Sequence, residues 1–394
     1  MQTKRVYADA VKNSRGEKTI RVIVRTSKGK FKTSAPSGKS KGEKEVKPYK
    51  KSLEKDIEYI NNICSNFIIE KFSDLKKVEK LVMGKIGGNT LFCLEASLLK
   101  ALATEIGKEL WEIINEKGSI INESKIKIKP VGNIIGGGLH SKGKQGIKPD
   151  FQEFLFIPKG GSFAEKIKTN NIAYKMAGKL LKSRQRNDEG AWETDKTNEG
   201  VLKIMEQVRN ELKNKNMKID IGLDIAASSF YRNRKYIYKN PKRSYESKKQ
   251  INYIKMLIDR FNIFYIEDPL DENNFSGFRS LMKNNILIVG DDLTTTNPER
   301  LKKAIRMKSI NAIIIKPNQI GSLLKVKKVI DIAKKAKIKT IISHRSGETK
   351  DDTIADLGVG FECDFIKAGV YGDIRKSKLN RLIQIENYIS KNKK

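Results

Sequence analysis

The chain has 394 residues, of which 38% are hydrophobic and 32% are charged, a composition typical of a globular protein with two domains. No apolar stretch approaches the roughly 20 residues of a membrane-spanning helix, and the basic N-terminus lacks the apolar core of a secretory signal. The cysteines Cys64, Cys93 and Cys363 are odd in number and lack the close spacing of a zinc site, so free thiols are expected. These features predict a cytoplasmic protein.

The formal net charge of +34 is extreme. It is compatible with lysine-rich composition spread over a solvated surface, with steering of a small anionic substrate, or with nucleic-acid binding. Lysine outnumbers arginine, the positive charges are scattered, and no aromatic-interleaved or RGG-like segment accompanies them. Composition is therefore the favoured explanation, and nucleic-acid binding is possible from the charge but unsupported by a motif.

The N-terminal part changes from a strand pattern to a helix pattern. Residues 5–33 alternate in polarity around the turns SRGE and SKGK, which predicts a three-stranded meander. The segment 36–50 has the glycine, proline and serine content of a mobile loop. Apolar residues then recur at three- and four-residue spacing over 52–115, with Asn89 as the expected N-cap of the clearest helix. Strands followed by helices indicate an α+β domain, which we place at residues 1–125.

From residue 219 onward, short apolar runs end on single ionisable residues, and after Glu267 these recur at intervals of about 25 residues. The interval fits one strand, one helix and their loops, so residues 126–394 are predicted to form an α/β barrel. The carboxyl ends of barrel strands surround one mouth, where such barrels carry their chemistry. The strand-end residues are Asp224, Glu267, Asp291, Lys316, His344 and Lys367.

Three converging carboxylates, Asp224, Glu267 and Asp291, would repel one another unless a cation neutralised them. Hard oxygen ligands favour Mg²⁺ or a similar ion. Lys316, buried beside other cations, is expected to have a lowered pKa and to act as a base near neutral pH. A metal-bound substrate and a lysine base together favour removal of a proton next to a carboxylate.

The two histidines, His140 and His344, both lie in glycine- or serine-rich loop contexts, NIIGGGLHS and IISHRSGET. A lone histidine is more often structural than catalytic. In the second segment, however, Arg345 offers a planar bidentate donor and Ser346 a hydroxyl, a combination well suited to a phosphate.

Three further candidates lie outside the regular interval. Glu153 in DFQEFLFIP and Glu189 in QRNDEGAW are weak signals when read alone, because most glutamates are simply solvated. Ser40 lies in PSGKSKG, which is either a flexible loop that closes over a bound anion or an ordinary linker.

The order of these motifs resembles that of enolases over nearly the whole chain. The resemblance implies an N-terminal α+β cap of three strands and several helices, followed by an enolase-type TIM barrel whose first units are irregular. It implies a carbon–oxygen hydro-lyase that interconverts 2-phosphoglycerate and phosphoenolpyruvate in glycolysis or gluconeogenesis, as a homodimer or higher homo-oligomer. The matching segments are NSRGEKT, APSGKSKG, NIIGGGLHS, FQEFLFIP, NDEGAW, IGLDIAASSFY, YIEDPLDENNF, VGDDLTTTNPERL, IIIKPNQIGS and SHRSGETKDDTIADLGVG.

The resemblance implies two Mg²⁺ ions in each active site. By motif match, Asp224, Glu267 and Asp291 take the place of the ligands of the first ion. Ser40 falls on the loop serine that helps to hold the second ion, which is recruited together with the substrate.

The resemblance also implies the roles of the remaining candidates. Lys316 matches the base that removes the C2 proton, and Glu189 matches the acid that assists departure of the C3 hydroxyl, with Glu153 supporting it. The other matched positions surround the substrate: Gln152 and Lys367 at its carboxylate, Arg345 and Ser346 at its phosphate, and His140 and His344 as the two active-site histidines.

Several segments depart from the family pattern, and two other functions stay open. The chain has NDEGA where the family reads GDEGG, Pro317 follows the expected base, and AGVYGDIRKSK replaces TGAPxRSER, with loss of the arginine–serine pattern. A divergent paralogue that acts as an RNA-binding or scaffold protein is the first alternative. An enolase-superfamily enzyme acting on another carboxylate substrate is the second.

Overall fold

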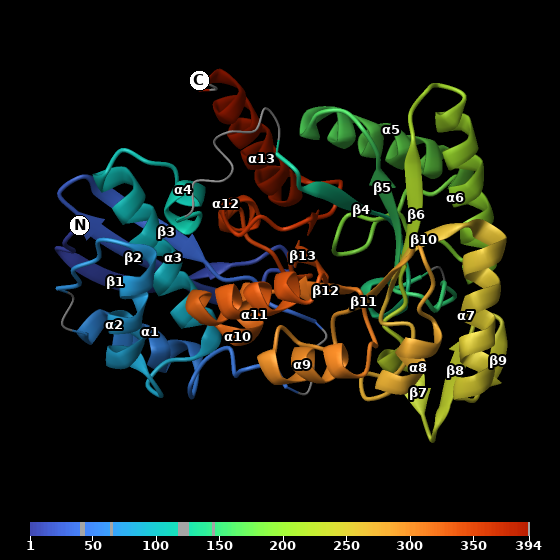
Figure 1. The fold of residues 1–394 in the computed structure, drawn as a ribbon, viewed down its shortest axis with the longest axis horizontal. Coiled ribbons are helices and arrows are strands. Elements are labelled where there is room, and N and C mark those ends of the chain that lie inside the picture. The colour runs from blue at the N-terminus through green and yellow to red at the C-terminus, as the bar shows by residue number, and fades with distance from the viewer. Residues whose placement is uncertain (40–43, 64–65, 117–125, 144–145, 393–394) are drawn as a thin grey trace.

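The computed structural model describes residues 1–39, 44–63, 66–116, 126–143 and 146–392. Ser40 and Cys64 lie outside these residues. Figure 1 shows an N-terminal unit of strands and helices beside a larger barrel unit, with the C-terminal helix at the top of the view. The predicted fold class, an α/β barrel preceded by a smaller α+β region, is confirmed.

The N-terminal unit begins with the predicted meander. Strands β1 (Arg5–Lys12), β2 (Lys18–Thr26) and β3 (Gly29–Ser34) form an antiparallel sheet in sequence order. Gly16 in the first turn and Gly29 at the start of β3 both have positive φ, a backbone conformation that glycine adopts without steric cost.

Helices follow the sheet, as the apolar spacing predicts. They are α1 (Leu53–Asn62), the short 3₁₀ helix η1 (Phe72–Asp74), α2 (Leu75–Val82), α3 (Gly88–Glu105) and α4 (Leu110–Ile114).

The start of α3 differs from the prediction, because the N-cap is Gly87 and not Asn89. A Cβ atom on Gly87 would lie 2.3 Å from the backbone of Tyr49, so close backbone packing selects glycine there. The Asn89 side chain instead donates to the Pro36 carbonyl at 3.3 Å and accepts from Asn318 Nδ2 at 3.0 Å. It thereby joins the N-terminal unit to the barrel.

Eight strands close the barrel in the order β4, β5, β6, β10, β11, β12, β13, β14, and β14 pairs with β4. Strand β5 runs antiparallel to both β4 and β6, whereas the other barrel pairs are parallel. The bounds are β4 (Lys129–Gly136), β5 (Glu153–Pro158), β6 (Ile219–Asp224), β10 (Ile263–Glu267), β11 (Leu287–Gly290), β12 (Ala312–Ile315), β13 (Lys339–Ser343) and β14 (Phe365–Lys367).

Apolar side chains fill the barrel interior, so the barrel is a packed core and not a pore. Val131, Leu155, Tyr265, Ile314 and Ile341 belong to this interior cluster, and each is almost fully buried.

The outer layer consists of helices that connect the strands (Figure 1). No helix in the described ranges is long and apolar enough to span a membrane. The helices are α5 (Phe163–Leu181), α6 (Asn198–Lys213), α7 (Ser247–Phe261), α8 (Phe275–Ser280), α9 (Pro298–Arg306), α10 (Pro317–Ile320), α11 (Leu323–Lys335), α12 (Thr353–Gly360) and α13 (Asp373–Lys391), with 3₁₀ turns η2 (Gly138–His140) and η3 (Ala227–Phe230).

A small antiparallel sheet, which the sequence did not suggest, follows β6. It consists of β7 (Tyr231–Arg232), β8 (Lys235–Lys239) and β9 (Lys242–Tyr245). The domain boundary at residues 125 and 126 stays a prediction, because residues 117–125 lie outside the described ranges.

Candidate active site

The strand-end residues gather at the carboxyl end of the barrel, where the sequence predicts them. Asp224, Glu267 and Lys367 are the last residues of β6, β10 and β14. Asp291, Lys316 and His344 directly follow β11, β12 and β13. A cavity of about 20 Å³ lies among them; its lining is Gly38, His140, Gln152, Glu153, Glu189, Asp224, Asp291, Lys316, Ser343, His344, Arg345, Ser346 and Lys367.

Every described candidate except Glu267 lines this cavity, and Glu267 contacts Lys367, which does line it. The Lys367 ammonium is 2.9 Å from both Asp224 Oδ2 and Glu267 Oε2, and 3.1 Å from Glu153 Oε2. Burial lowers the pKa of Lys367, but the three carboxylates outweigh it and hold that pKa well above its ordinary value. A single lysine thus neutralises part of a buried acidic cluster.

The carboxylates fit a divalent cation. Glu153, Asp224, Glu267 and Asp291 are all buried, and Asp291 Oδ1 has no hydrogen-bond partner among the described residues. Buried, unpartnered carboxylate oxygens are hard ligands of the type that Mg²⁺ prefers. Lys367 and Lys316 together offset only part of this buried negative charge, which favours a cation at this end of the barrel.

Two carboxylates outside the predicted triad are also placed to bind a cation. Asp268, Asp291 and Asp292 offer ligand atoms within 4.8 Å of one another, whereas Lys367 lies between Asp224 and Glu267. Asp268 also accepts from the Asp291 and Asp292 amides at 3.1 and 2.6 Å. Sequence reasoning missed Asp268 and Asp292, although the adjacent acids in YIEDP and VGDD were an available signal.

The environment of Lys316 differs from the expected one. Burial and the neighbouring Arg345 and Lys367 cations lower the pKa of Lys316, but its contact with the Asp291 carboxylate outweighs them, so the pKa is raised. The expectation of a lowered pKa is therefore wrong for the protein without ligands. The position of Lys316 is well defined, because its amide donates to Thr296 Oγ1 at 3.0 Å and Pro317 starts α10 directly after it.

His140 and two glutamates form a coupled acid–base group. His140 Nδ1 lies 3.4 Å from Glu189 Oε1 and 3.6 Å from Glu153 Oε1, and all three side chains are buried. Burial acts against charge on His140, but the two carboxylates raise its pKa to about 10. Burial, together with the Glu189 charge, raises the pKa of Glu153 to about 7.

The same group gives Glu189 an unexpected protonation state. Burial acts to raise the pKa of Glu189, but the positive charge of His140 and its contact with the carboxylate hold that pKa well below its ordinary range. Asn133 Nδ2 also donates to Glu189 Oε2 at 3.1 Å. His140 therefore favours an ionised Glu189, whereas Glu153, with a pKa of about 7, is partly protonated near neutral pH.

A pH dependence of stability follows from His140. Because its folded-state pKa of about 10 exceeds its ordinary value of 6.5, its stabilising effect is complete below pH 6.5 and is lost as the pH rises toward 10. Urea unfolding in EDTA should show a loss of about a few kcal/mol over that range, and His140→Asn should flatten the curve there. Curves of identical shape for both proteins would contradict the assignment.

The other histidine provides the matched control. Burial and the Arg375 charge hold the pKa of His344 well below 6.5, so its contribution is present above pH 6.5 and is lost as the pH falls. His344→Asn should therefore change the stability curve only below pH 6.5.

The N-terminal unit completes the predicted phosphate-binding end of the cavity. Arg15 Nη1 donates to Ser346 Oγ at 2.6 Å, and the Lys39 amide donates to the same oxygen at 2.9 Å. Arg345 Nη1 lies 3.0 Å from Glu45 Oε2. A Cβ atom on Gly38 would lie 1.9 Å from the Arg345 guanidinium, so this approach requires glycine. Ser40, the predicted ligand of a second ion, lies outside the described residues.

Arg375 is a further residue at this site that sequence reasoning missed. From α13, its buried guanidinium lies 2.6 Å from His344 Nδ1 and donates to the Arg345 and Ser346 carbonyls at 2.9 and 2.7 Å. An arginine cannot accept a hydrogen bond, so Nδ1 of His344 is the acceptor. The arginine–serine pattern is lost from the sequence, but an arginine in the first turn of α13 was an available signal.

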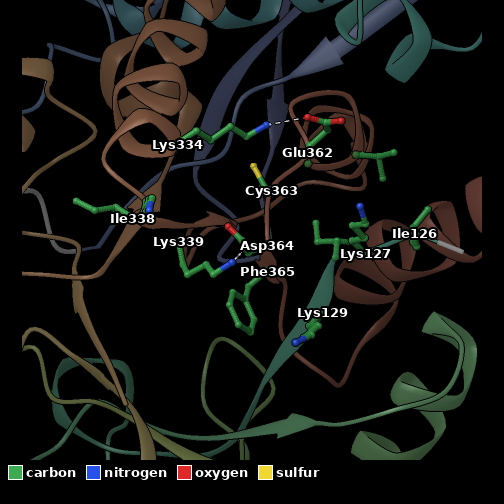
Figure 2. Close-up of a pocket in the computed structure, with 14 residues that line it drawn as sticks. Ile126, Lys127, Lys129, Lys334, Ile338, Lys339, Glu362, Cys363, Asp364 and Phe365 are labelled. Carbon is green, nitrogen blue, oxygen red and sulfur yellow. Dashed lines mark hydrogen bonds and ion pairs between the residues drawn. The ribbon is translucent and has the colours of Figure 1, made fainter. Parts of the chain in front are cut away.

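Another cavity lies at the opposite, amino end of the barrel. Figure 2 shows this cavity of about 780 Å³, in which Lys334 pairs with Glu362 and Lys339 pairs with Asp364. Cys363 also lines it, but burial raises the pKa of its thiol to about 12, so it is no nucleophile. The candidate catalytic residues instead line the small polar cavity at the carboxyl end.

Comparison with known proteins agrees with the geometry. Residues 125–394 match the family model described as "Enolase, C-terminal TIM barrel domain". The enolase of Thermoplasma acidophilum is 35% identical over 400 residues, which cover 96% of this chain and 97% of the relative. The enolase of Archaeoglobus fulgidus is 36% identical over 404 residues, covering 98% and 97%, and that of Methanosphaera stadtmanae is 37% identical over 400 residues, covering 95% and 94%.

These relatives match both the N-terminal unit and the barrel, because the identity extends over nearly the whole chain. With a family model over the barrel and relatives above 30% identity, the chain belongs to the enolase family of hydro-lyases.

Proposed function

We propose that this enzyme catalyses the reversible, Mg²⁺-dependent dehydration of 2-phosphoglycerate to phosphoenolpyruvate. The observation that carries the proposal is the convergence, in one buried cavity, of a lysine, a coupled acid–base group, a carboxylate cluster and an arginine–serine pair. Each part answers one chemical need of this reaction: a base for C2, an acid for the C3 hydroxyl, a cation site and a phosphate site.

Asp224, Glu267 and Asp291 are the proposed ligands of the first Mg²⁺, and Ser40 belongs to the site of a second ion recruited with the substrate. Their burial and excess negative charge support this assignment. When bound, the divalent ions would stabilise the negative charge that accumulates at the substrate carboxylate as the C2 proton leaves.

Lys316 is the proposed base, and it must lose a proton before it can accept one from C2. In the protein without ligands it is paired with Asp291. The cavity of about 20 Å³ has room for little more than a water molecule, so the groups that line it must separate for substrate to bind, and Lys316 must leave Asp291 to accept a proton. Lys316 would then remain beside Arg345 and Lys367, both of which lower its pKa.

Glu189 is the proposed acid for the leaving hydroxyl, supported by Glu153. Because Glu189 is ionised without a ligand, it must first receive a proton. His140 and Glu153 are the proton sources, because the pKa of each is raised and both glutamates lie beside the same His140 Nδ1 atom, Glu189 at 3.4 Å and Glu153 at 3.6 Å. An anionic substrate beside these groups favours protonation of Glu189 by charge repulsion.

The substrate's two anionic ends have separate proposed contacts. Arg345 and Ser346 bind the phosphate, since a guanidinium matches its geometry in a bidentate manner. Gln152 and Lys367 bind the carboxylate end; Gln152 Nε2 already lies 3.3 Å from Asp224 Oδ2, so it is oriented toward the metal ligands. His344 also lines the cavity.

Turnover of 2-phosphoglycerate, followed by the ultraviolet absorbance of phosphoenolpyruvate, tests the proposal. A parallel panel of non-phosphorylated hydroxy acids tests the alternative of another carboxylate substrate. If a hydroxy acid without phosphate reacted faster, the assignment of Arg345 and Ser346 would be wrong. Salt-sensitive RNA binding without turnover would instead favour the RNA-binding alternative.

Removal of divalent metal is expected to abolish turnover. EDTA should lower the rate by at least about 10³-fold, because several kcal/mol of charge stabilisation would be lost, and excess Mg²⁺ should restore it. Mg²⁺ should also raise the melting temperature through binding to the folded state.

The carboxylates of β6 supply a variant and its matched control. Asp224→Asn should abolish the Mg²⁺-induced rise in melting temperature. Asp220→Asn should preserve it, since Asp220 pairs with Lys159 at 2.8 Å at the other end of the strand. An equal Mg²⁺ response in both variants would contradict the proposed ligand set.

A further inference from the structure

The loop that carries Glu189 is closed by its own hydrogen bonds. Asn187 Oδ1 accepts from the Glu189 amide at 3.0 Å and from the Ala191 amide at 2.9 Å. The Gly190 amide donates to the Asn187 carbonyl at 3.0 Å. This arrangement fixes the shape of the loop, but it does not by itself hold the loop against the rest of the protein.

Backbone hydrogen bonds join Trp192 to Ile134 and Gly136 of β4. A four-residue stack, formed by Tyr174, Arg186, Trp192 and Tyr371, adds an attachment to α5 and to the segment after β14. The Arg186 guanidinium carbon lies 4.2 Å from the Trp192 ring centroid and 4.1 Å from that of Tyr371. The Tyr174 ring stacks on the same two rings, with centroids 4.9 and 5.5 Å apart and interplanar angles of 22° and 10°. The ring–ring distances lie in the range of favourable aromatic stacking, and the guanidinium–ring distances lie in that of cation–π contacts.

The members of the stack come from three parts of the chain. Arg186 and Trp192 flank the Glu189 loop, Tyr174 belongs to α5, and Tyr371 follows Lys367, the last residue of β14. The stack therefore joins the Glu189 loop to the segment that carries Lys367.

Hydrogen bonds connect the stack to Gly190, the residue after Glu189. The Tyr174 hydroxyl donates to the Gly190 carbonyl at 2.7 Å and accepts from Arg186 Nε at 2.8 Å. Trp192 Nε1 donates to the Tyr174 carbonyl at 2.8 Å. Gly190 has φ of 82°, and a Cβ atom there would lie 2.7 Å from the Tyr371 carbonyl oxygen. Gly190, the residue after Glu189, is thus held by the Tyr174 hydroxyl and packed against the Tyr371 backbone.

We propose that the stack of Tyr174, Arg186, Trp192 and Tyr371 is a clamp that positions Glu189 relative to Lys367 for the second half of the reaction. The clamp rests on the proposed function, because it acts through the role of Glu189. Two departures of this chain from the family pattern, NDEGA and AGVYGDIRKSK, supply Asn187 and Tyr371. The loop of this chain therefore has less glycine, and side-chain contacts fix its conformation.

Kinetics of Tyr371 variants test the clamp. Tyr371→Ala should lower kcat by about 10- to 100-fold, the effect expected when a catalytic group is misplaced by about 1 Å, and KM should stay within about threefold because the phosphate site is untouched. Tyr371→Phe retains the ring and should retain activity. Tyr174→Phe removes the hydroxyl that holds Gly190 and should again lower kcat more than it changes KM.

A second arginine–tyrosine cluster offers a matched control. Arg243 lies 4.3 Å from the Tyr253 ring and 5.4 Å from the Tyr245 ring, and neither tyrosine lines the catalytic cavity. Tyr245→Ala removes the same kind of contact and should leave kcat unchanged. If Tyr245→Ala and Tyr371→Ala lowered kcat equally, the clamp would be merely structural and the proposal would be wrong.

Fluorescence gives a readout that does not depend on turnover. The chain has two tryptophans, and in a Trp111→Phe background Trp192 is the single reporter of the stack. Acrylamide quenching should increase in Tyr371→Ala and not in Tyr371→Phe or Tyr245→Ala. Increased quenching with an unchanged kcat would overturn the positioning role.

The two proposals can fail separately. Absence of wild-type turnover would overturn the proposed function and with it the clamp's catalytic role. Normal turnover of the wild type and of Tyr245→Ala, with no kcat change in Tyr371→Ala, would overturn the clamp alone.

Discussion

Replacement of Lys316 by alanine is expected to lower kcat by about 10³- to 10⁴-fold, the range lost when a general base is removed. Lys316 is fixed at the end of β12 by the hydrogen bond that its amide donates to Thr296 Oγ1, and its ammonium contacts Asp291 inside the catalytic cavity. The absorbance of phosphoenolpyruvate provides the measurement. Because the loss affects the C2 proton, exchange of that proton with solvent should fall together with turnover.

Lys339→Ala is the matched control for Lys316→Ala. Lys339 starts the neighbouring strand β13 at the amino end of the barrel, where it pairs with Asp364 at 2.7 Å. It should retain full turnover, since it is remote from the carboxyl end. Undiminished turnover in Lys316→Ala would eliminate the proposed mechanism. If the variant still exchanged the C2 proton with solvent but no longer released the C3 hydroxyl, Lys316 would not be the C2 base.

The strand ends could be predicted from sequence because their signal is local. A β-branched run such as NAIIIK buries its apolar side chains in a parallel sheet, so the lysine that ends it has to reach the barrel mouth. The same argument located Asp224, Glu267 and Lys367. The N-terminal meander was predictable for a similar reason, because alternation and turn residues lie within a few positions of each other.

Other features depend on contacts between distant residues and leave no local pattern. β5 pairs antiparallel with β4 and with β6, and no local pattern in its sequence distinguishes it from a parallel strand. The raised pKa of Lys316 depends on its contact with Asp291, and the orientation of His344 depends on Arg375. Arg15 reaches Ser346 across more than 300 positions of sequence. In each case the decisive partner is set by the fold and not by neighbours in the chain.

The same long-range chemistry makes Lys367 the residue with the largest expected effect on stability. Its ammonium contacts Glu153, Asp224 and Glu267, whose side chains are almost fully buried. Lys367→Met keeps similar volume but leaves these carboxylates unpaired, which should lower the free energy of unfolding by about 3–5 kcal/mol in EDTA. Urea unfolding at pH 8 measures the loss, and turnover should fall as well.

Lys378→Met is the matched control, because Lys378 is also buried and pairs with a single carboxylate, Glu348, at 3.0 Å. Both variants should be destabilised, but Mg²⁺ should restore stability only in Lys367→Met, where the unpaired carboxylates include the proposed metal ligands. An equal response of both variants to Mg²⁺ would argue against a cation site at the Lys367 cluster.

The pH dependence of the stability of Lys367→Met gives a second, independent test of the carboxylate charge at this cluster. Burial and mutual repulsion already raise the pKa of Glu267 well above its ordinary value in the wild type, and loss of the ammonium removes the main opposing charge. A carboxyl group with a raised folded-state pKa destabilises the fold as the pH rises above its unfolded value of about 4.3. The variant's stability deficit should therefore be small near pH 5 and should grow toward pH 8. A deficit independent of pH would mean that lost packing, and not uncompensated carboxylate charge, accounts for the effect of Lys367.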